Sequence, residues 1–291
     1  MLEGLNISKE VGQSVWPKEE KKPVDVRQER KNDARIREEV EKKLKRDDSY
    51  DASEEEKLKK KIEESSFNSE INRLISEEIV SHRLGNLSVI ESMAILALKL
   101  EKDLLNYDTI ISDDASGRLV SLFLRELVDK KRKESGKPDV QTYFISGGAE
   151  GITKKEEFLR GKKDKLGRVL LVTEYVVTGE HVGALACLLE KLGVNFDMAA
   201  LSAVMPKKYG DKKIIFGSKG SVGIDLWNYP QVAGVYTKVG GIKKHVLHPR
   251  HIRHITKEDP ESTVFFDQET INEAMQDIKD IAQVVAEKLL K

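Results

Sequence analysis

The chain has 291 residues and carries 50 Lys and Arg against 50 Asp and Glu, so its formal net charge is zero although 34% of its residues are charged. Proteins that neutralise a phosphate backbone usually carry a basic excess, so this balance argues against a nucleic-acid partner. No run approaches ~20 apolar residues, which argues against a membrane span, and the first residues lack a secretory signal pattern. The single cysteine, Cys187, excludes an internal disulfide. We therefore expect a soluble, cytoplasmic protein in which Cys187 is a core residue.

Residues 1–66 differ in composition from the rest of the chain. They hold 17 Lys and Arg and 18 Asp and Glu, with few large apolar side chains between them. Such a segment buries too little apolar surface to offset the entropy lost on ordering. We expect a charged leader over 1–66 that is disordered or a solvated helix, with 34–46 as its helical part. An arm dedicated to binding a partner is the alternative. Residues 67–291 are then the folded domain, with helical additions at both of its ends.

Helical and strand patterns alternate from Phe67 onward. Apolar residues spaced by three and four predict helices over 67–79, 88–104, 119–132, 182–192 and 270–290. Short apolar runs predict strands over 107–112, 140–146, 168–174, 196–204 and 212–216. This alternation predicts an α/β fold, in which a parallel, Rossmann-like sheet is covered by helices on both faces.

Two loops between predicted strands and helices have chemistry that suits phosphate. In Asp113–Arg118, the backbone N–H groups of Ser116 and Gly117 come at a helix start, and Arg118 supplies a guanidinium. The second loop, 173–181, joins a buried strand to an amphipathic helix. Ligands of open parallel sheets bind beyond the carboxyl ends of the strands, where both loops are expected. An ordinary strand-to-helix turn is the alternative for each loop taken singly.

Taken together, the two segments resemble the type I phosphoribosyltransferase family. RVLLVTEYVVTGEHVGALACLLEKLG, residues 168–193, is similar to the family signature of strand, acidic pair, Thr-Gly loop and helix. YDTIISDDASGRLVSLFL, residues 107–124, is similar to the first core strand, the pyrophosphate loop and the next helix. The resemblance covers about residues 88–225 and implies a phosphoribosyltransferase-like fold.

The family resemblance implies a ligand, a reaction and a set of site residues. The ligand would be phosphoribosyl pyrophosphate (PRPP) or a nucleotide monophosphate, and the reaction a Mg²⁺-assisted displacement at C1 by a nucleobase or related acceptor, with release of pyrophosphate. The catalytic carboxylate would be Glu174, beside the ribose hydroxyls. The substrate-binding residues would be Val177, Thr178, Gly179, Glu180 and His181 around the 5′-phosphate, and Ala115, Ser116, Gly117 and Arg118 around the pyrophosphate. Residues 147–167 would be a mobile basic lid, a solvated Lys-rich surface loop being the alternative.

The chain departs from the family pattern at four positions, which keeps other functions open. Thr173 stands in place of one acid, Val177 removes a proton acceptor, Glu180 adds a carboxylate and His181 replaces a small hydroxyl residue. These departures favour, as the alternative, a non-catalytic regulatory or binding protein that kept the fold. A third hypothesis is an interaction protein that works through its leader and its His/Arg-rich tail. The sequence leaves the acceptor and the choice between monomer and homo-oligomer open.

Two further patterns have uses other than catalysis. The histidines His245, His248, His251 and His254 are spaced by three, but Pro249 interrupts a helix that would align them, so we expect an anion-binding or partner-binding segment and not a zinc site. Trp227 and Tyr229 follow a glycine-rich run and are read as packing residues, with a base-stacking wall as the alternative.

Overall fold

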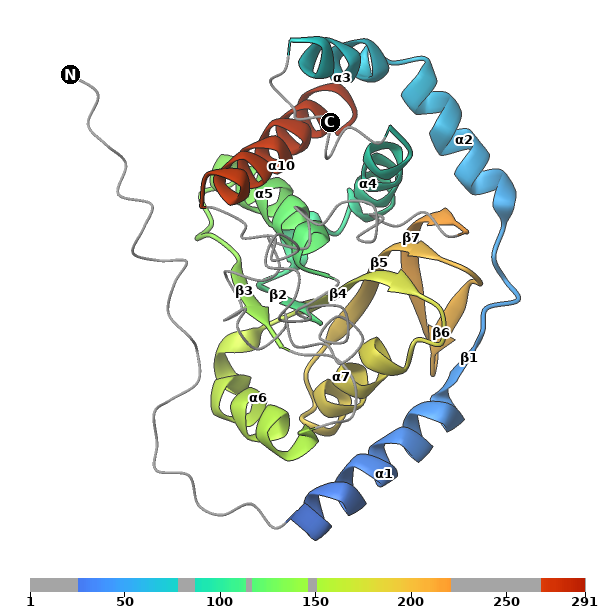
Figure 1. Ribbon diagram of the computed structural model, residues 1–291, viewed down its shortest axis with the longest axis vertical. Helices are drawn as coiled ribbons and strands as arrows, with labels where there is room; N and C mark the ends of the chain where they lie inside the picture. Colours follow the sequence, from blue (N-terminus) through green and yellow to red (C-terminus); the bar gives the residue numbers. More distant parts are fainter. Residues whose placement is uncertain (1–25, 78–86, 114–116, 146–150, 221–267, 291) are drawn as a thin grey trace, which may run out of the picture.

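The computed structural model describes residues 26–77, 87–113, 117–145, 151–220 and 268–290, which form a seven-stranded, mostly parallel sheet between two layers of helices (Figure 1). The strand order is β1-β6-β7-β5-β4-β2-β3. The parallel strands are β2 (Thr109–Ser112), β3 (Gln141–Phe144), β4 (Val169–Val176), β5 (Phe196–Ala203) and β7 (Lys212–Lys219). At one edge, β6 (Lys207–Tyr209) runs antiparallel to both β7 and β1 (Leu44–Arg46). The expected α/β class is confirmed.

Helices cover both faces of the sheet, as right-handed crossovers between parallel strands require. One face carries α4 (Leu87–Leu100), α5 (Arg118–Glu134) and α10 (Gln268–Lys288), with α2 (Ala52–Glu63) and α3 (Phe67–Ser76) packed outside them. The opposite face carries α1 (Val26–Lys43), α6 (Ile152–Leu166) and α7 (Glu180–Lys191). A short 3₁₀ helix, Leu104–Asn106, precedes β2. The chain crosses from β2 to β3 over one face and from β3 to β4 over the other, so β2 lies between β3 and β4 in the sheet.

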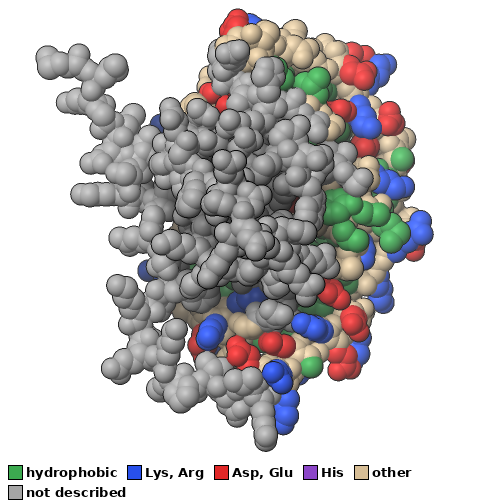
Figure 2. Space-filling view, in the orientation of Figure 1, with side chains coloured by type: hydrophobic (Ala, Val, Ile, Leu, Met, Phe, Trp, Pro, Cys, Tyr) green, Lys and Arg blue, Asp and Glu red, His purple; other side chains and the backbone are tan. Residues whose placement is uncertain are grey.

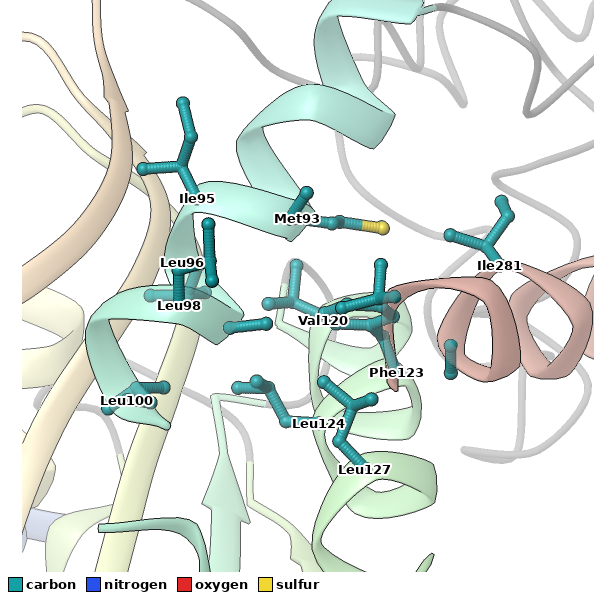
Figure 3. Close-up of a cluster of buried hydrophobic side chains, with 14 of the residues drawn as sticks. Met93, Ile95, Leu96, Leu98, Leu100, Val120, Phe123, Leu124, Leu127 and Ile281 are labelled. Atoms are coloured by element: carbon teal, nitrogen blue, oxygen red, sulfur yellow. The ribbon is translucent and has the colours of Figure 1, made fainter. Parts of the chain in front are cut away.

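The buried residues form two cores, one on each face, because successive side chains of a strand point to opposite sides. Leu170 and Val172 of β4 belong to the core under α4, α5 and α10, whereas Val169 and Leu171 belong to the core under α6 and α7. Figure 3 shows the first core where side chains of α4, α5 and α10 meet. Cys187 lies in the second core, where burial raises the pKa of its thiol, and its expected place in the core is confirmed.

The charged leader is folded against the domain from Val26 onward, so the expectation of a solvated segment is wrong for residues 26–66. Ile36 and Val40 of α1 are buried in the core under α6 and α7. Two apolar side chains are enough to bury this face of α1 because α7 has a glycine at the contact, which lets the two helices approach closely. A Cβ built at Gly183 would lie 2.6 Å from Val40 Cγ1. Ion pairs between Lys43 and Glu190, and between Lys191 and Glu39, fasten the same helices.

The segment expected to be a mobile lid is a packed helix over the part that the structure describes. Residues 152–166 form α6, the crossover helix between β3 and β4. Ile152, Leu159 and Leu166 recur every seven residues, so they fall on one helix face, and all three are buried. Their burial anchors the helix while most of its basic side chains stay at the surface. Both sequence-based interpretations, lid and solvated loop, are therefore wrong for 152–166.

The other predicted elements agree with the structure to within a few residues, whereas α2, β1 and β6 were not predicted. Residues 221–267 lie outside the described part of the chain. The interpretations of the histidines at 245–254 and of Trp227 and Tyr229 fall on these residues and stay predictions. Among the described helices none has the length and apolar character that crossing a membrane requires. On the face that Figure 2 shows, acidic and basic side chains of the described residues are interspersed.

Candidate functional site

The two phosphate-type loops lie at the point where the sheet reverses its strand order. Strand β2 is flanked by β3 on one side and β4 on the other, so the chain leaves β2 in one direction and returns in the opposite one. The helices that follow β2 and β4, α5 and α7, cover opposite faces. Open α/β sheets bind ligands in the crevice beyond the strands at such a point. The fold therefore selects the same place as the sequence pattern.

A hydrogen bond joins the residues that follow β2 to β4. Asp113 Oδ2 accepts from Thr173 Oγ1 at 2.7 Å, and Asp113 Oδ1 accepts from the Gly117 backbone N–H at 2.8 Å. One buried carboxylate thus fixes both the start of α5 and its position beside β4. Thr173 stands where the family pattern has an acid, and a second carboxylate at this distance from Asp113 would repel it. The hydroxyl of Thr173 instead makes the contact attractive.

Gly117 fills a packing role at the N-cap of α5. Its φ of −83° suits any residue, so the position does not require a glycine for backbone reasons. A Cβ there, however, would lie 2.5 Å from Ser112 Oγ, 2.6 Å from the Val172 carbonyl oxygen and 2.7 Å from Asp113 Oδ1. The start of α5 therefore lies directly against the end of β2 and the middle of β4, and only a residue without a side chain fits.

Arg118 is the first residue of α5 and is enclosed by the protein, with 1% of its surface exposed. Its guanidinium lies over the ring of Phe144, the last residue of β3, with 4.2 Å between the guanidinium carbon and the ring centroid. Stacking on an aromatic face stabilises a buried guanidinium and fixes its plane. The predicted pyrophosphate residue is thus a fixed cation at the carboxyl end of the sheet, within the span of three neighbouring strands, β3, β2 and β4.

Glu174 is a second buried acid at this edge of the sheet, besides Asp113. It belongs to β4, only 3% of its surface is exposed, and by alternation it points to the face of Leu170 and Val172, which α4 and α5 cover. Lys155, in the second turn of α6, is also buried. Buried ionised groups are costly unless opposite charges and hydrogen bonds compensate them. The carboxyl edge therefore holds four of the buried charged residues of the described structure, the acids Asp113 and Glu174 and the bases Arg118 and Lys155.

The loop between β4 and α7 is mostly exposed, unlike the start of α5. Val177 and Thr178 lie at the surface, and Gly179 is the N-cap of α7 with a φ of 81°, a conformation that favours glycine. Glu180 and His181 form the exposed first turn of α7. The backbone N–H of Glu180 donates to Thr178 Oγ1 at 3.4 Å. This is the expected strand, Thr-Gly turn and helix start, open to solvent.

Residues far away in the sequence hold this loop from outside. Lys207 Nζ, from β6, donates to the Thr178 carbonyl oxygen at 2.7 Å. Leu44, from β1, packs over the glycine of the turn: a Cβ built at Gly179 would lie 2.8 Å from Leu44 Cδ2. Sequence reasoning missed both contacts, and neither residue lies in a local pattern that marks it.

Most of the predicted site residues thus lie at one edge of the sheet. Those that the structure describes are Gly117, Arg118, Glu174, Val177, Thr178, Gly179, Glu180 and His181. Ala115 and Ser116 lie outside the described residues. The structure adds Asp113, Thr173 and Lys207 to the predicted set, as the groups whose hydrogen bonds fix the two loops.

Within the described ranges, no group of three or more His, Cys, Asp or Glu side chains is arranged to hold a metal ion. Mg²⁺ differs from zinc or calcium in that it usually keeps several waters and binds through one or two carboxylates together with substrate phosphates. Both oxygens of Asp113 already accept hydrogen bonds from the protein. The described residues therefore fit an ion that is carried by a phosphorylated ligand better than a resident metal centre.

Comparisons of the chain with models of protein families, with curated proteins and with solved structures find no match.

Proposed function

We propose that this protein is phosphoribosyltransferase-like and binds PRPP or a nucleotide monophosphate at the carboxyl ends of β2 and β4. The observation that carries the proposal is the hydrogen bond between Thr173 and Asp113, because it ties the strand that leads into the predicted phosphate turn to the predicted pyrophosphate loop. Helix starts at α5 and α7 orient backbone N–H groups and positive dipole ends toward this edge.

Each described residue has a defined place in the proposed complex. Arg118 supplies positive charge beneath the pyrophosphate, and its stacking on Phe144 means that it does not reorganise when the ligand arrives. The turn at Thr178 and Gly179 receives the 5′-phosphate, and Glu174 faces the ribose hydroxyls. A Mg²⁺ ion carried by the pyrophosphate would neutralise charge on the leaving group.

The second candidate is a binding or regulatory protein without transferase activity, and one contact favours it. Asp113 uses both carboxylate oxygens to hold Gly117 and Thr173, and Thr173 is not ionisable. Of the acidic pair that the family pattern carries after the buried strand, only Glu174 is present. Val177 likewise removes one candidate proton acceptor, at the opening of the phosphate loop. Binding needs none of these groups, whereas transfer to an acceptor that loses a proton does.

Thermal unfolding with PRPP and Mg²⁺ tests the binding proposal. A ligand at 100 times its Kd adds about 2.7 kcal/mol to the free energy of unfolding, so the unmodified protein is expected to melt at a higher temperature. Glu174→Gln should weaken this stabilisation, whereas Glu63→Gln on the exposed surface of α2 is the matched control and should not. No stabilisation of the unmodified protein by either PRPP or nucleotide monophosphates would contradict the proposal.

Pyrophosphate release separates the two candidate functions. The protein is mixed with PRPP, Mg²⁺ and a panel of nucleobases, and free pyrophosphate is measured. Release that depends on one base identifies a transferase and its acceptor. Stabilisation by PRPP without release for any base supports the binding or regulatory protein.

A further inference from the structure

The ammonium of Lys207 lies against the turn that is proposed to receive the 5′-phosphate. Its Nζ donates to the Thr178 carbonyl oxygen at 2.7 Å, although the two residues are 29 positions apart in the chain. An ammonium carries three N–H donors, of which this bond uses one. A lysine in this position both fixes the turn and brings a compact positive charge to it.

The position of Lys207 is set by the leader. Lys207 begins β6, and its partner in the sheet is Arg46 of β1. The same strand β1 places Leu44 over Gly179. The antiparallel pair β1–β6 therefore presents two contacts to one turn, an apolar one on Gly179 and a charged one on Thr178.

The positive charge of Lys207 compensates for a negative charge in the predicted phosphate loop. Glu180 follows the turn directly and carries a charge of the same sign as a phosphate. A cation within contact distance of the turn opposes this repulsion, and lysine binds phosphate as a point charge. The stretch 168–193 that resembles the family signature contains no cation next to the turn except His181, so the positive charge has to come from elsewhere in the fold.

We propose that Lys207 is a ligand-binding and positioning residue of the β4–α7 turn: it holds the Thr178 carbonyl and donates to the 5′-phosphate of the bound ligand. This inference rests on the proposed function and deepens it, since it assigns an anion-binding group that the sequence pattern does not contain. It also gives the leader a role at the site, because β1 fixes the strand that carries Lys207.

Equilibrium binding of PRPP with Mg²⁺ to three variants of the full chain tests this inference. Lys207→Met is expected to raise the Kd about tenfold, the factor that corresponds to about 1.4 kcal/mol. Lys207→Arg retains the charge and is expected to stay within about threefold of the unmodified protein. Lys208→Met is the matched control: it removes a neighbouring charge from the same strand, on the opposite side of the sheet.

Two readouts separate this role from a merely structural one. The unfolding temperature of Lys207→Met without ligand should fall only slightly, because one hydrogen bond to the Thr178 carbonyl is lost, whereas the dependence of its Kd on salt should be shallower. A Kd of Lys207→Met equal to that of the unmodified protein, or an equal loss in Lys208→Met, overturns the inference and leaves the proposed function standing. Failure of the unmodified protein to bind PRPP removes both.

Discussion

The two loops of the candidate site are built in opposite ways. The start of α5 is enclosed: Asp113, Gly117 and Arg118 are buried, and Asp113 accepts its hydrogen bonds from the N-cap of α5 and from the neighbouring strand β4. The turn before α7 is exposed, and Leu44 and Lys207 hold it from outside. The difference teaches that a substitution in the first loop should act on folding, whereas one in the second should act on binding.

Gly117→Ala tests the enclosed loop and has the largest expected effect. The added Cβ would meet Ser112 Oγ, the Val172 carbonyl oxygen and Asp113 Oδ1 at 2.5–2.7 Å, and one of these atoms is backbone and cannot rotate away. We expect a loss on the order of 3 kcal/mol in the free energy of unfolding, measured by urea titration. Gly161→Ala is the control, because this glycine lies in the interior of α6 with open space around it, and it should gain about 1 kcal/mol. Equal effects of the two substitutions would contradict the enclosed packing.

Acid should weaken the hold of the leader on α7, the helix that follows the second loop. Burial pushes the pKa of Glu39 upward, but hydrogen bonds from Lys191 and Cys187 and the charges of Lys191 and Lys43 outweigh it, so this pKa lies below its ordinary 4.5. A lowered carboxyl pKa contributes stability above the ordinary value and loses it as the pH falls through the folded one. Glu39→Gln should therefore cost up to about 1 kcal/mol at pH 7, and this difference from the unmodified protein should shrink as the pH falls below about 4.5 and vanish below the folded pKa.

The measurement for the leader is urea unfolding at a series of pH values, supported by amide hydrogen exchange of α1. Glu38→Gln is the matched control, since Glu38 is an exposed neighbour on the same helix that pairs only within the helix. A difference between Glu39→Gln and the unmodified protein that persists at pH 3 would show that Glu39 does not act through its charge.

Glu180→Gln has the smallest expected effect on folding and sharpens the contrast between the loops. Glu180 is exposed at the start of α7, so the free energy of unfolding should change by less than about 0.5 kcal/mol. Removing a charge that repels phosphate should instead tighten PRPP binding about fivefold, measured as a Kd. An unchanged Kd would place the phosphate away from this turn.

The sequence predicted best those elements whose apolar residues are continuous or regularly repeated. The run Val169–Val172 predicts a buried strand because every side chain is apolar, and the structure buries it on both faces. The leader was missed because Ile36 and Val40 form a stripe of only two residues on α1. Such a stripe is buried only when the opposing helix allows a close approach, and Gly183 provides it from a distant part of the chain. Local patterns carry no record of that partner.

In the candidate site, too, residues in local patterns were predictable and residues that depend on distant contacts were not. Gly179 and Arg118 lie in local patterns of strand, turn and helix start, so their place at the carboxyl edge was predictable. From the sequence, Thr173 is interpreted only as the loss of one acid of the family pattern. Its hydrogen bond to Asp113 shows that it joins β4 to the loop that follows β2. Lys207 begins a strand of three residues, too short to be recognised by its pattern, and its function depends on a pairing with β1.

The pairing of the leader with the C-terminal half of the domain also has a consequence during synthesis. Lys43 and Glu190, which join α1 to α7, are 147 residues apart, so the ribosome needs roughly 7–30 s to make the second after the first, at about 5–20 residues per second. Throughout this interval α1 lacks α7, the helix against which Ile36 and Val40 are buried. Its dense, balanced charge and sparse apolar side chains keep it from associating with other nascent chains while it waits. The composition that made the leader look unstructured thus also suits a segment that docks on a helix made much later.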